Sequence, residues 1–185
     1  MIRFFDIVFS LLGILLLSPV FLLLYIAICL ESKGGGFYKQ LRVGRYGGDF
    51  YVYKFRSMRV GADKKGLITV GGRDPRITRT GYLIRKYKLD ELPQLFNVLK
   101  GDMSLVGTRP PTLDEWEKYE PHHRARMSFR PGLTGLWQVS GRSNITDFEE
   151  VVRLDTQYIG EWSVKGDIKI IWQTAVGVLR NDGAM

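Results

Sequence analysis

Residues 7–30, IVFSLLGILLLSPVFLLLYIAICL, form a run of 24 residues without a charged side chain. Roughly 20 helical residues are enough to cross the ~30 Å hydrocarbon core of a bilayer. The run is too long for a cleaved signal peptide, and no small-residue cleavage site follows it. The sequence therefore predicts a membrane helix over residues 1–31 and a separate extramembrane domain over residues 32–185.

A serine–proline pair lies in the middle of this run. Pro19 lacks the N–H that would bond to the carbonyl of Leu15, and its ring clashes with that carbonyl. The Ser18 hydroxyl can return a hydrogen bond to a nearby carbonyl. Each half of the run is ~17 Å long as a helix, which is about half of the hydrocarbon core. Two topologies stay open: a kinked spanning helix, and a re-entrant helix broken at Ser18-Pro19 with both ends in the cytoplasm.

Basic residues are more frequent after this run than before it. Lys33, Lys39, Arg42 and Arg45 follow it, whereas Arg3 precedes it. Because basic flanks stay on the cytoplasmic side of a membrane, the bulk of the protein is expected in the cytoplasm.

The composition limits the class of protein and its partners. The 185 residues suffice for one domain with a real core. The 27 Lys+Arg against 19 Asp+Glu, a formal net charge of +8, indicate an anionic partner: nucleic acid, a membrane surface or a phosphorylated substrate. Cys29 is the only cysteine, so no internal disulfide can form. The sequence has neither a GxxxxGK[ST] loop nor a metal-spaced Cys/His set.

The remaining sequence predicts an α+β domain that is mostly helical. Aromatic-rich runs separated by glycines favour a short β-hairpin. The expected elements are hairpin strands at 37–40 and 50–55, a loop over 61–80, and helices at 82–88, 93–99, 112–127 and 168–179. The last of these carries an apolar stripe of Ile168, Ile171, Trp172, Ala175 and Leu179. This stripe, with Trp162, either faces the core or lies at a lipid interface as an amphipathic helix, and both interpretations stay open.

Two adjacent carboxylates, Asp90 and Glu91, precede Pro93, a residue suited to the first turn of a helix. We expect Leu92, Leu95, Phe96 and Leu99 to form the apolar face of that helix, and Gly101 to cap its C-terminal end. The carboxylates would then lie at the helix N-terminus, where free N–H groups favour anions.

Simple helix capping is the ordinary explanation for such a pair. Arg85, Lys86, Lys88 and Arg109 nearby favour a second one, a phosphate site. An ionised aspartate among desolvated arginines could attack phosphorus and form an acyl phosphate. A divalent ion would offset the crowded anions, which fits Mg²⁺ shared with a diphosphate substrate. The neighbours His122 and His123 would point about 100° apart on a helix, so a shared metal site is not expected.

In several motifs, nearly from end to end, this sequence resembles the monotopic phosphoglycosyl transferases, also called bacterial sugar transferases. The motifs are Ser18-Pro19, Tyr53-Lys54-Phe55-Arg56-Ser57-Met58, Asp74-Pro75-Arg76-Ile77-Thr78, Leu89-Asp90-Glu91-Leu92-Pro93-Gln94-Leu95, Asn97-Val98-Leu99-Lys100-Gly101-Asp102-Met103-Ser104-Leu105-Val106-Gly107 and Arg130-Pro131-Gly132-Leu133-Thr134-Gly135-Leu136-Trp137-Gln138.

The resemblance implies an activity and a location. Members transfer a phosphosugar from a nucleotide diphosphate sugar, typically a UDP-sugar, to polyprenyl (undecaprenyl) phosphate. This is the first membrane step of exopolysaccharide, capsule, O-antigen or glycoprotein glycan assembly. The family also implies a re-entrant helix at the cytoplasmic face of the bacterial inner membrane and contact with lipids. The apolar run and the arginines beside the carboxylates argue for a lipid or nucleotide phosphate instead of nucleic acid, and a homo-oligomer stays open.

The resemblance also implies roles for single residues. Asp90 would be the nucleophile of a covalent intermediate, and Glu91 would orient it and help to hold Mg²⁺, so both are expected metal ligands. The expected phosphate-binding residues are Lys54, Arg85, Arg109 and Arg142. The chain departs from the family pattern at Thr108, where proline is common, and in its loose hinge Gly34-Gly35-Gly36. The alternative function is a non-catalytic, membrane-anchored module that binds anionic lipid.

Overall fold

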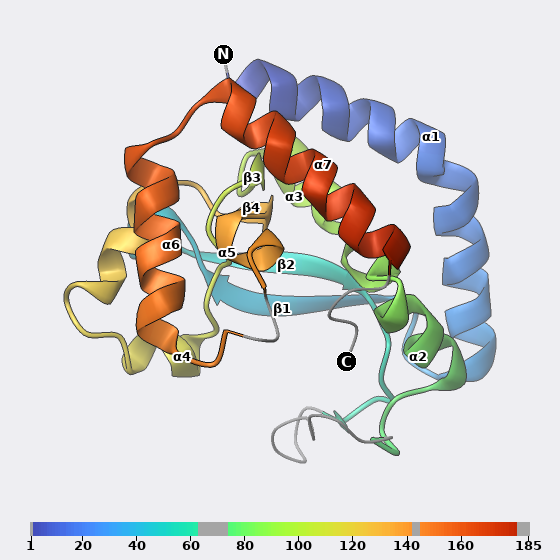
Figure 1. Cartoon of the computed structure of the whole chain (residues 1–185). Helices are drawn as coiled ribbons and strands as arrows, with labels where there is room; N and C mark the ends of the chain where they lie inside the picture. Colours follow the sequence, from blue (N-terminus) through green and yellow to red (C-terminus); the bar gives the residue numbers. More distant parts are fainter. Residues whose placement is uncertain (1, 63–73, 142–144, 181–185) are drawn as a thin grey trace.

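The computed structural model describes residues 2–62, 74–141 and 145–180. Its first element is helix α1 (Ile2–Glu31), which changes direction in its middle (Figure 1). Pro19 lies inside this helix, and the Ser18 hydroxyl donates a hydrogen bond to the carbonyl of Leu15 at 2.8 Å. This is the hydrogen bond that the serine–proline pair predicts.

One stripe of α1 packs against the rest of the protein, and most of its other side chains are exposed. The buried residues of α1 are Asp6, Ser10, Phe21 and Ile28. Between them, a Cβ added at Gly13 would come within 3.3 Å of Leu95, so glycine allows α1 and α3 (Gln94–Lys100) to approach closely. The helix is long and apolar enough to cross a membrane, although its apolar side chains largely face outward.

Polar contacts hold both ends of α1. Near its start, Arg3 donates to two carbonyls at the end of α3. Asp6 is buried and accepts hydrogen bonds from the Ser104 hydroxyl and the Leu105 N–H, each at 2.9 Å, in β3 (Ser104–Val106). At the other end, Glu31 accepts two backbone N–H groups of the first turn of α2 (Arg79–Lys86), at 2.6 and 2.8 Å. The same domain therefore anchors both ends of the apolar helix.

The predicted hairpin is confirmed. Strands β1 (Phe37–Val43) and β2 (Asp49–Phe55) pair antiparallel, with Phe37 opposite Phe55 and Val43 opposite Asp49. The glycine-rich connection holds a short 3₁₀ turn, η1 (Arg45–Gly47), in which Tyr46 has a positive φ of 60°. The first strand runs three residues beyond the predicted 37–40, and this extension includes Arg42.

Helix α3 ends at Gly101, with φ of 100°, as predicted, but its buried face differs from the predicted one. Phe96 is exposed, whereas Asn97 is fully buried. The Asn97 amide oxygen accepts the Tyr53 N–H at 2.9 Å, and its NH₂ donates to the Tyr51 carbonyl at 2.7 Å. A polar side chain thus satisfies one N–H and one carbonyl at the edge of β2. This requirement rotates the helix away from its most apolar face.

The second half of the domain surrounds a short parallel pair of β3 and β4 (Gly132–Thr134). Helices α5 (Leu136–Val139), α6 (Phe148–Gly160) and α7 (Val164–Arg180) cover it (Figure 1). A cluster of Val106, Tyr158 and Ile170 joins β3, α6 and α7. The sequence did not predict α6.

Two further predictions need correction. The predicted helix 112–127 is broken: α4 (Leu113–Glu117) starts at a capping box on Thr112, and the 3₁₀ helix η4 (His123–Ser128) follows. Pro121 lies between them, and proline cannot continue a hydrogen-bonded helix. The helix predicted at 82–88 is α2, which starts earlier because the Thr78 hydroxyl caps it by accepting the Gly81 N–H at 2.9 Å. Of the predicted loop 61–80, residues 63–73 lie outside the described residues.

The apolar stripe of α7 points outward at Ile168, Ile171 and Trp172. Ile168 and Trp172 are 63% and 70% exposed, and Ile171 is also exposed, whereas Ile170 faces the core. The core-facing interpretation of this stripe is therefore wrong. Trp162 does not share the exposed face: it packs against the core and donates its Nε1–H to Asp167 at 3.0 Å.

Candidate active site

Asp90 and Glu91 lie in a 3₁₀ turn, η3 (Leu89–Glu91), immediately before α3. The preceding Lys88 has a left-handed backbone, with φ of 56°. Leu89 and Leu92 pack on the core cluster of α1, β2 and α2, which fixes this turn against the middle of the domain. The local sequence therefore uses its two leucines to anchor the turn that carries the acidic pair.

The predicted position of the pair at the helix N-terminus needs a correction. Helix α3 begins at Gln94, with Pro93 as its N-cap. The N–H groups of Glu91 and Leu92 bond within the turn, to the carbonyls of Lys88 and Leu89 at 3.3 and 3.2 Å. These N–H groups are consequently engaged, and side-chain cations must supply most of the anion binding.

The structure brings five of the predicted site residues together. Glu91 lies 3.4 Å from the Lys54 ammonium in β2 and 3.6 Å from the Arg109 guanidinium in the segment after β3. Asp90 interacts electrostatically with Glu91, Lys54 and Arg85, the last of which comes from α2. Three separate parts of the chain thus supply cations to one acidic pair. Arg142, predicted to bind phosphate, lies outside the described residues.

Burial and charge perturb the titration of this group. Burial, followed by the neighbouring Glu91 carboxylate, raises the pKa of Asp90 to about 6, against the opposing effect of Lys54 and Arg85. Burial lowers the pKa of Lys54, and the nearby Arg109 and Arg42 lower it further, while Glu91 opposes the change. Both pKa shifts show that the ionised forms of Asp90 and Lys54 are disfavoured by burial away from water. A divalent cation at the carboxylates and an anion at the cations would relieve this strain.

Arg42 is a site residue that sequence reasoning used only as a basic flank of the membrane helix. It lines a small pocket with Lys54, Gln94 and Arg109. Burial, followed by the charge of Arg109, lowers the pKa of Arg42 to about 10. The alternation of the strands could have revealed it. Arg42 in β1 lies opposite Phe50 in β2, and Lys54 follows Phe50 by four residues in β2, so Arg42 and Lys54 lie on the same face of the hairpin.

A larger cavity of about 350 Å³ opens on the other side of Arg109. Its walls include Pro110, Tyr119, Trp137 and Phe148. The Trp137 Nε1–H is buried and has no hydrogen-bond partner among the described residues. An aromatic wall beside an arginine that pairs with the acidic turn suits a heterocycle attached to a phosphate.

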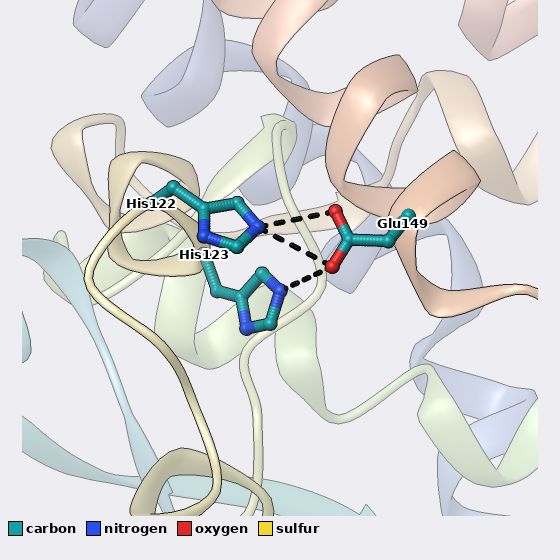
Figure 2. A group of neighbouring side chains, drawn as sticks. All are labelled: His122, His123 and Glu149. Atoms are coloured by element: carbon teal, nitrogen blue, oxygen red, sulfur yellow. Dashed lines mark hydrogen bonds and ion pairs between the residues drawn. The ribbon is translucent and has the colours of Figure 1, made fainter.

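Figure 2 shows that His122 and His123 converge on one carboxylate, that of Glu149 at the start of α6. The Nε2 atoms lie 3.1 and 2.7 Å from the Glu149 oxygens, and the two ring centroids are 4.0 Å apart. The expectation that the rings point apart is wrong, because this segment starts a 3₁₀ helix after Pro121 instead of continuing an α-helix.

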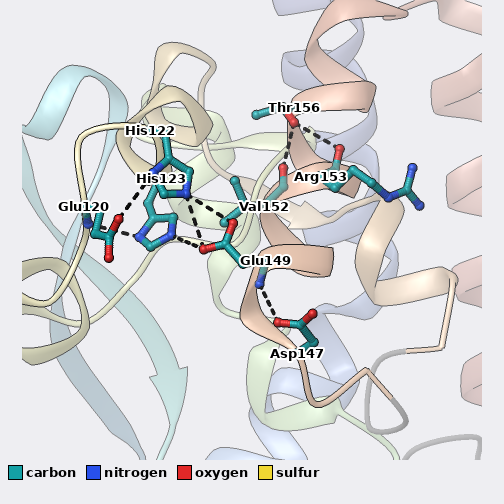
Figure 3. Close-up of polar contacts among 8 residues, drawn as sticks. All are labelled: Glu120, His122, His123, Asp147, Glu149, Val152, Arg153 and Thr156. Carbon is teal, nitrogen blue, oxygen red and sulfur yellow. Dashed lines mark hydrogen bonds and ion pairs between the residues drawn. The ribbon is translucent and has the colours of Figure 1, made fainter.

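The hydrogen bonds of this cluster determine a tautomer (Figure 3). The Glu120 N–H donates to His123 Nδ1 at 3.0 Å, so the neutral ring carries its proton on Nε2 and donates it to Glu149. That nitrogen then has no lone pair for a metal ion, and a metal-ligating histidine would instead donate from its other nitrogen. The contacts with His123 and His122 lower the pKa of Glu149. We interpret the cluster as a brace that ties η4 to α6 behind the wall of the cavity formed by Phe148.

The fold and the site define a class of protein: a membrane-associated domain with an acidic pair set among buried cations. The sequence profile of the bacterial sugar transferases matches residues 1–181, and this chain belongs to that family.

Three relatives illustrate the similarity. The chain is 52% identical to galactosyl transferase CpsE of Streptococcus agalactiae serotype III, covering 98% of the chain and 43% of that protein. It is 44% identical to undecaprenyl-phosphate galactose phosphotransferase of Salmonella typhimurium, covering 98% and 41%. It is 40% identical to UDP-glucose:undecaprenyl-phosphate glucose-1-phosphate transferase of Caulobacter vibrioides, covering 98% and 71%. The chain thus spans less than half the length of the first two.

Proposed function

We propose that this chain transfers a sugar 1-phosphate from a UDP-sugar to undecaprenyl phosphate. The products would be undecaprenyl diphosphate sugar and UMP. The observation that carries the proposal is the convergence of Lys54, Arg85 and Arg109 on the Asp90–Glu91 pair, in a domain attached to a membrane helix. The names of the Salmonella and Caulobacter relatives give undecaprenyl phosphate as their acceptor, which supports the same acceptor here.

The reaction would proceed in two displacements at one phosphorus. An ionised Asp90 oxygen attacks the β-phosphorus of the UDP-sugar, the bond to the bridging oxygen breaks, and UMP leaves with the electron pair. An oxygen of the carrier phosphate then attacks the same phosphorus, and the Asp90 carboxylate leaves. Lys54, Arg85 and Arg109 hold the phosphate oxygens, a role also expected for Arg142.

The cavity beside Arg109 offers a place for the nucleoside. A pyrimidine there could pack on the aromatic side chains Tyr119, Trp137 or Phe148. Arg109 would then lie between the nucleoside and the acidic turn, where the diphosphate must be.

The acidic pair also fits a magnesium ion. Asp90 and Glu91 supply neighbouring carboxylate oxygens, and burial together with the Glu91 charge raises the pKa of Asp90, so a cation bound there would favour the ionised form. Mg²⁺ prefers oxygen ligands and is commonly shared between one or two carboxylates and substrate phosphates. When bound, it would neutralise charge on the diphosphate. The cations Lys54 and Arg109 lie 3.4 and 3.6 Å from Glu91 and hold it beside Asp90.

We also propose a re-entrant topology. A helix that spans a bilayer has ends about 30 Å apart on opposite sides, whereas the same domain holds both ends of α1 through Asp6 and Glu31. The bend at Pro19 lets the helix enter and leave one leaflet. The exposed Ile168 and Trp172 suit α7 to the lipid interface as an amphipathic helix. The domain of residues 32–185 would thus lie at the cytoplasmic face of the bacterial inner membrane.

The substitution Asp90→Asn tests the function. It removes the nucleophile and nearly preserves shape, so turnover should fall below about a hundredth of the wild-type rate, while membrane association survives. UMP release from a panel of UDP-sugars, with undecaprenyl phosphate present, measures turnover. A module that merely binds anionic lipid would release no UMP, and its lipid binding would depend on salt but not on Asp90. A variant with more than that residual rate would reject the covalent mechanism.

A further inference from the structure

Arg42 donates a hydrogen bond to the segment that carries Arg109. Its Nη1 donates to the Pro110 carbonyl at 2.9 Å, and its Nη2 donates to the Gln40 side chain at 3.0 Å. The next residue, Val43, donates its N–H to the Pro111 carbonyl at 3.1 Å. Arg42 is only 9% exposed, and it also pairs with Glu115 at 3.6 Å, as a buried arginine requires. The end of β1 therefore clamps two successive carbonyls that follow Arg109.

The same segment is fixed on its other side. Gly107 donates its N–H to β4 at 2.8 Å, and the Thr108 hydroxyl donates to the Arg126 carbonyl at 3.0 Å. Because Pro110 and Pro111 have no N–H, their carbonyls are the only backbone hydrogen-bonding groups that can fix this end of the segment. Arg109 consequently lies between two anchors, one on β4 and η4 and the other on β1. Only the β1 anchor depends on a side chain that also lines the small pocket beside Lys54 and Arg109, namely that of Arg42.

Charge gives a second reason to fix this segment. Arg42, Lys54 and Arg109 line one pocket, and beyond the effect of burial the charge of Arg109 lowers the pKa of both Arg42 and Lys54. Carboxylates pair with these cations: Glu115 lies 3.6 Å from Arg42, and Glu91 lies 3.4 Å from Lys54 and 3.6 Å from Arg109. The hydrogen bond from Arg42 to the Pro110 carbonyl holds Arg109 in place against the repulsion of the neighbouring cations.

We propose that Arg42 is a positioning residue of the reaction: it holds the Pro110 carbonyl so that Arg109 faces Glu91 and the diphosphate. This inference rests on the proposed function. Displacement at phosphorus is in line, and Asp90 is the nucleophile in the first step and the leaving group in the second. The phosphate that leaves and the phosphate that enters must therefore use the same side of the phosphorus. Arg109, and Arg42 through it, acts in both half-reactions.

The experiment compares Arg42→Met, Arg42→Lys, Arg109→Met and the double variant Arg42→Met/Arg109→Met in the purified full chain. UMP release without acceptor measures the first half-reaction, and transfer of the trapped phosphosugar to undecaprenyl phosphate measures the second. Thermal unfolding of each variant monitors folding. Arg45→Met is the matched control, because Arg45 also donates to a carbonyl, that of Ser128 at 3.2 Å, but does not line the pocket.

We expect Arg42→Met to slow both half-reactions by about 100-fold, as a displaced catalytic group does. The double variant should be no slower than Arg109→Met, because Arg42 acts through Arg109. Arg42→Lys keeps the charge but loses the fork of two donors, and should still slow both steps by about tenfold. Arg45→Met should resemble the wild type.

Three results would overturn the inference: losses that multiply in the double variant, an Arg42→Lys variant as active as the wild type, or slowing that follows only the unfolded fraction. Arg42→Lys decides the matter if Arg42→Met does not fold. Wild-type UMP release in the same assay keeps this test separate from the proposed function, since a wild type that releases no UMP would refute that function instead.

Discussion

The raised pKa of Asp90 predicts how the first half-reaction depends on pH. A pKa of about 6 leaves about nine-tenths of this carboxylate ionised at pH 7, half at pH 6 and about a tenth at pH 5. Only the ionised form attacks phosphorus, so the rate at low substrate should fall about tenfold from pH 7 to pH 5. The diphosphate of a nucleotide sugar loses its protons at far lower pH and does not titrate in this range.

The substitution Lys54→Met sharpens this prediction. The Lys54 charge favours the ionised carboxylate, so its removal should raise the pKa of Asp90. The fall in rate at acidic pH, the acidic limb of the pH–rate profile, should then move to higher pH by on the order of one unit. More Mg²⁺ should move the acidic limb of the wild type to lower pH, because a cation at the acidic pair favours ionisation. The measurement is UMP release per enzyme without acceptor, across pH and magnesium concentration.

Lys100→Met is the control for net charge. This substitution also removes one positive charge, but the Lys100 side chain is half-exposed and pairs with Asp102 outside the site. The fall of the Lys100→Met rate at acidic pH should therefore match that of the wild type. A rate that stays constant from pH 7 to pH 5, or a limb that Lys54→Met leaves in place, would refute the electrostatic account of the site.

Three more predictions concern the framework. Asp6→Leu removes the acceptor of two buried donors and should lower stability by about 1–3 kcal/mol, measured by thermal unfolding in detergent; it should also make a tag at Met1 accessible from outside the cell. Gly107→Ala should abolish folding or activity, because its Cβ would meet backbone oxygen at 2.3 Å, whereas Gly177→Ala in α7 meets nothing within 4 Å and should stabilise by about 0.5–1 kcal/mol. Glu149→Gln weakens the brace behind the cavity and should raise the KM for the UDP-sugar more than it lowers kcat.

Each framework prediction has a clear contrary result. A Met1 tag that stays cytoplasmic in Asp6→Leu would show that the Ser18–Pro19 bend alone determines topology. A folded, active Gly107→Ala protein would mean that the segment before Arg109 has room the structure does not show. An unchanged KM in Glu149→Gln would separate the histidine–glutamate cluster from substrate binding.

The local sequence determined several features by itself. The apolar run and its serine–proline pair sufficed for a bent membrane helix, because the freed Leu15 carbonyl needs a partner and Ser18 is the nearest donor. Alternation and glycines sufficed for the hairpin, and Gly101 sufficed for the end of α3. These are interactions between residues a few positions apart, which a linear pattern records. The motifs Leu89-Asp90-Glu91-Leu92 and Tyr53-Lys54 likewise sufficed to identify the acidic pair and the cation Lys54.

Tertiary structure decided what depends on partners far along the chain. Asn97 is buried and bonds to the edge of β2, which has no further strand beside it among the described residues, whereas its neighbour Phe96 lies at the surface. Glu149 meets two histidines from 26 and 27 residues away. Arg42 became part of the site only when β1 met the segment that follows Arg109, 68 residues from Pro110. Such contacts follow from how elements pack, and packing is a property of the whole chain that no single stretch encodes.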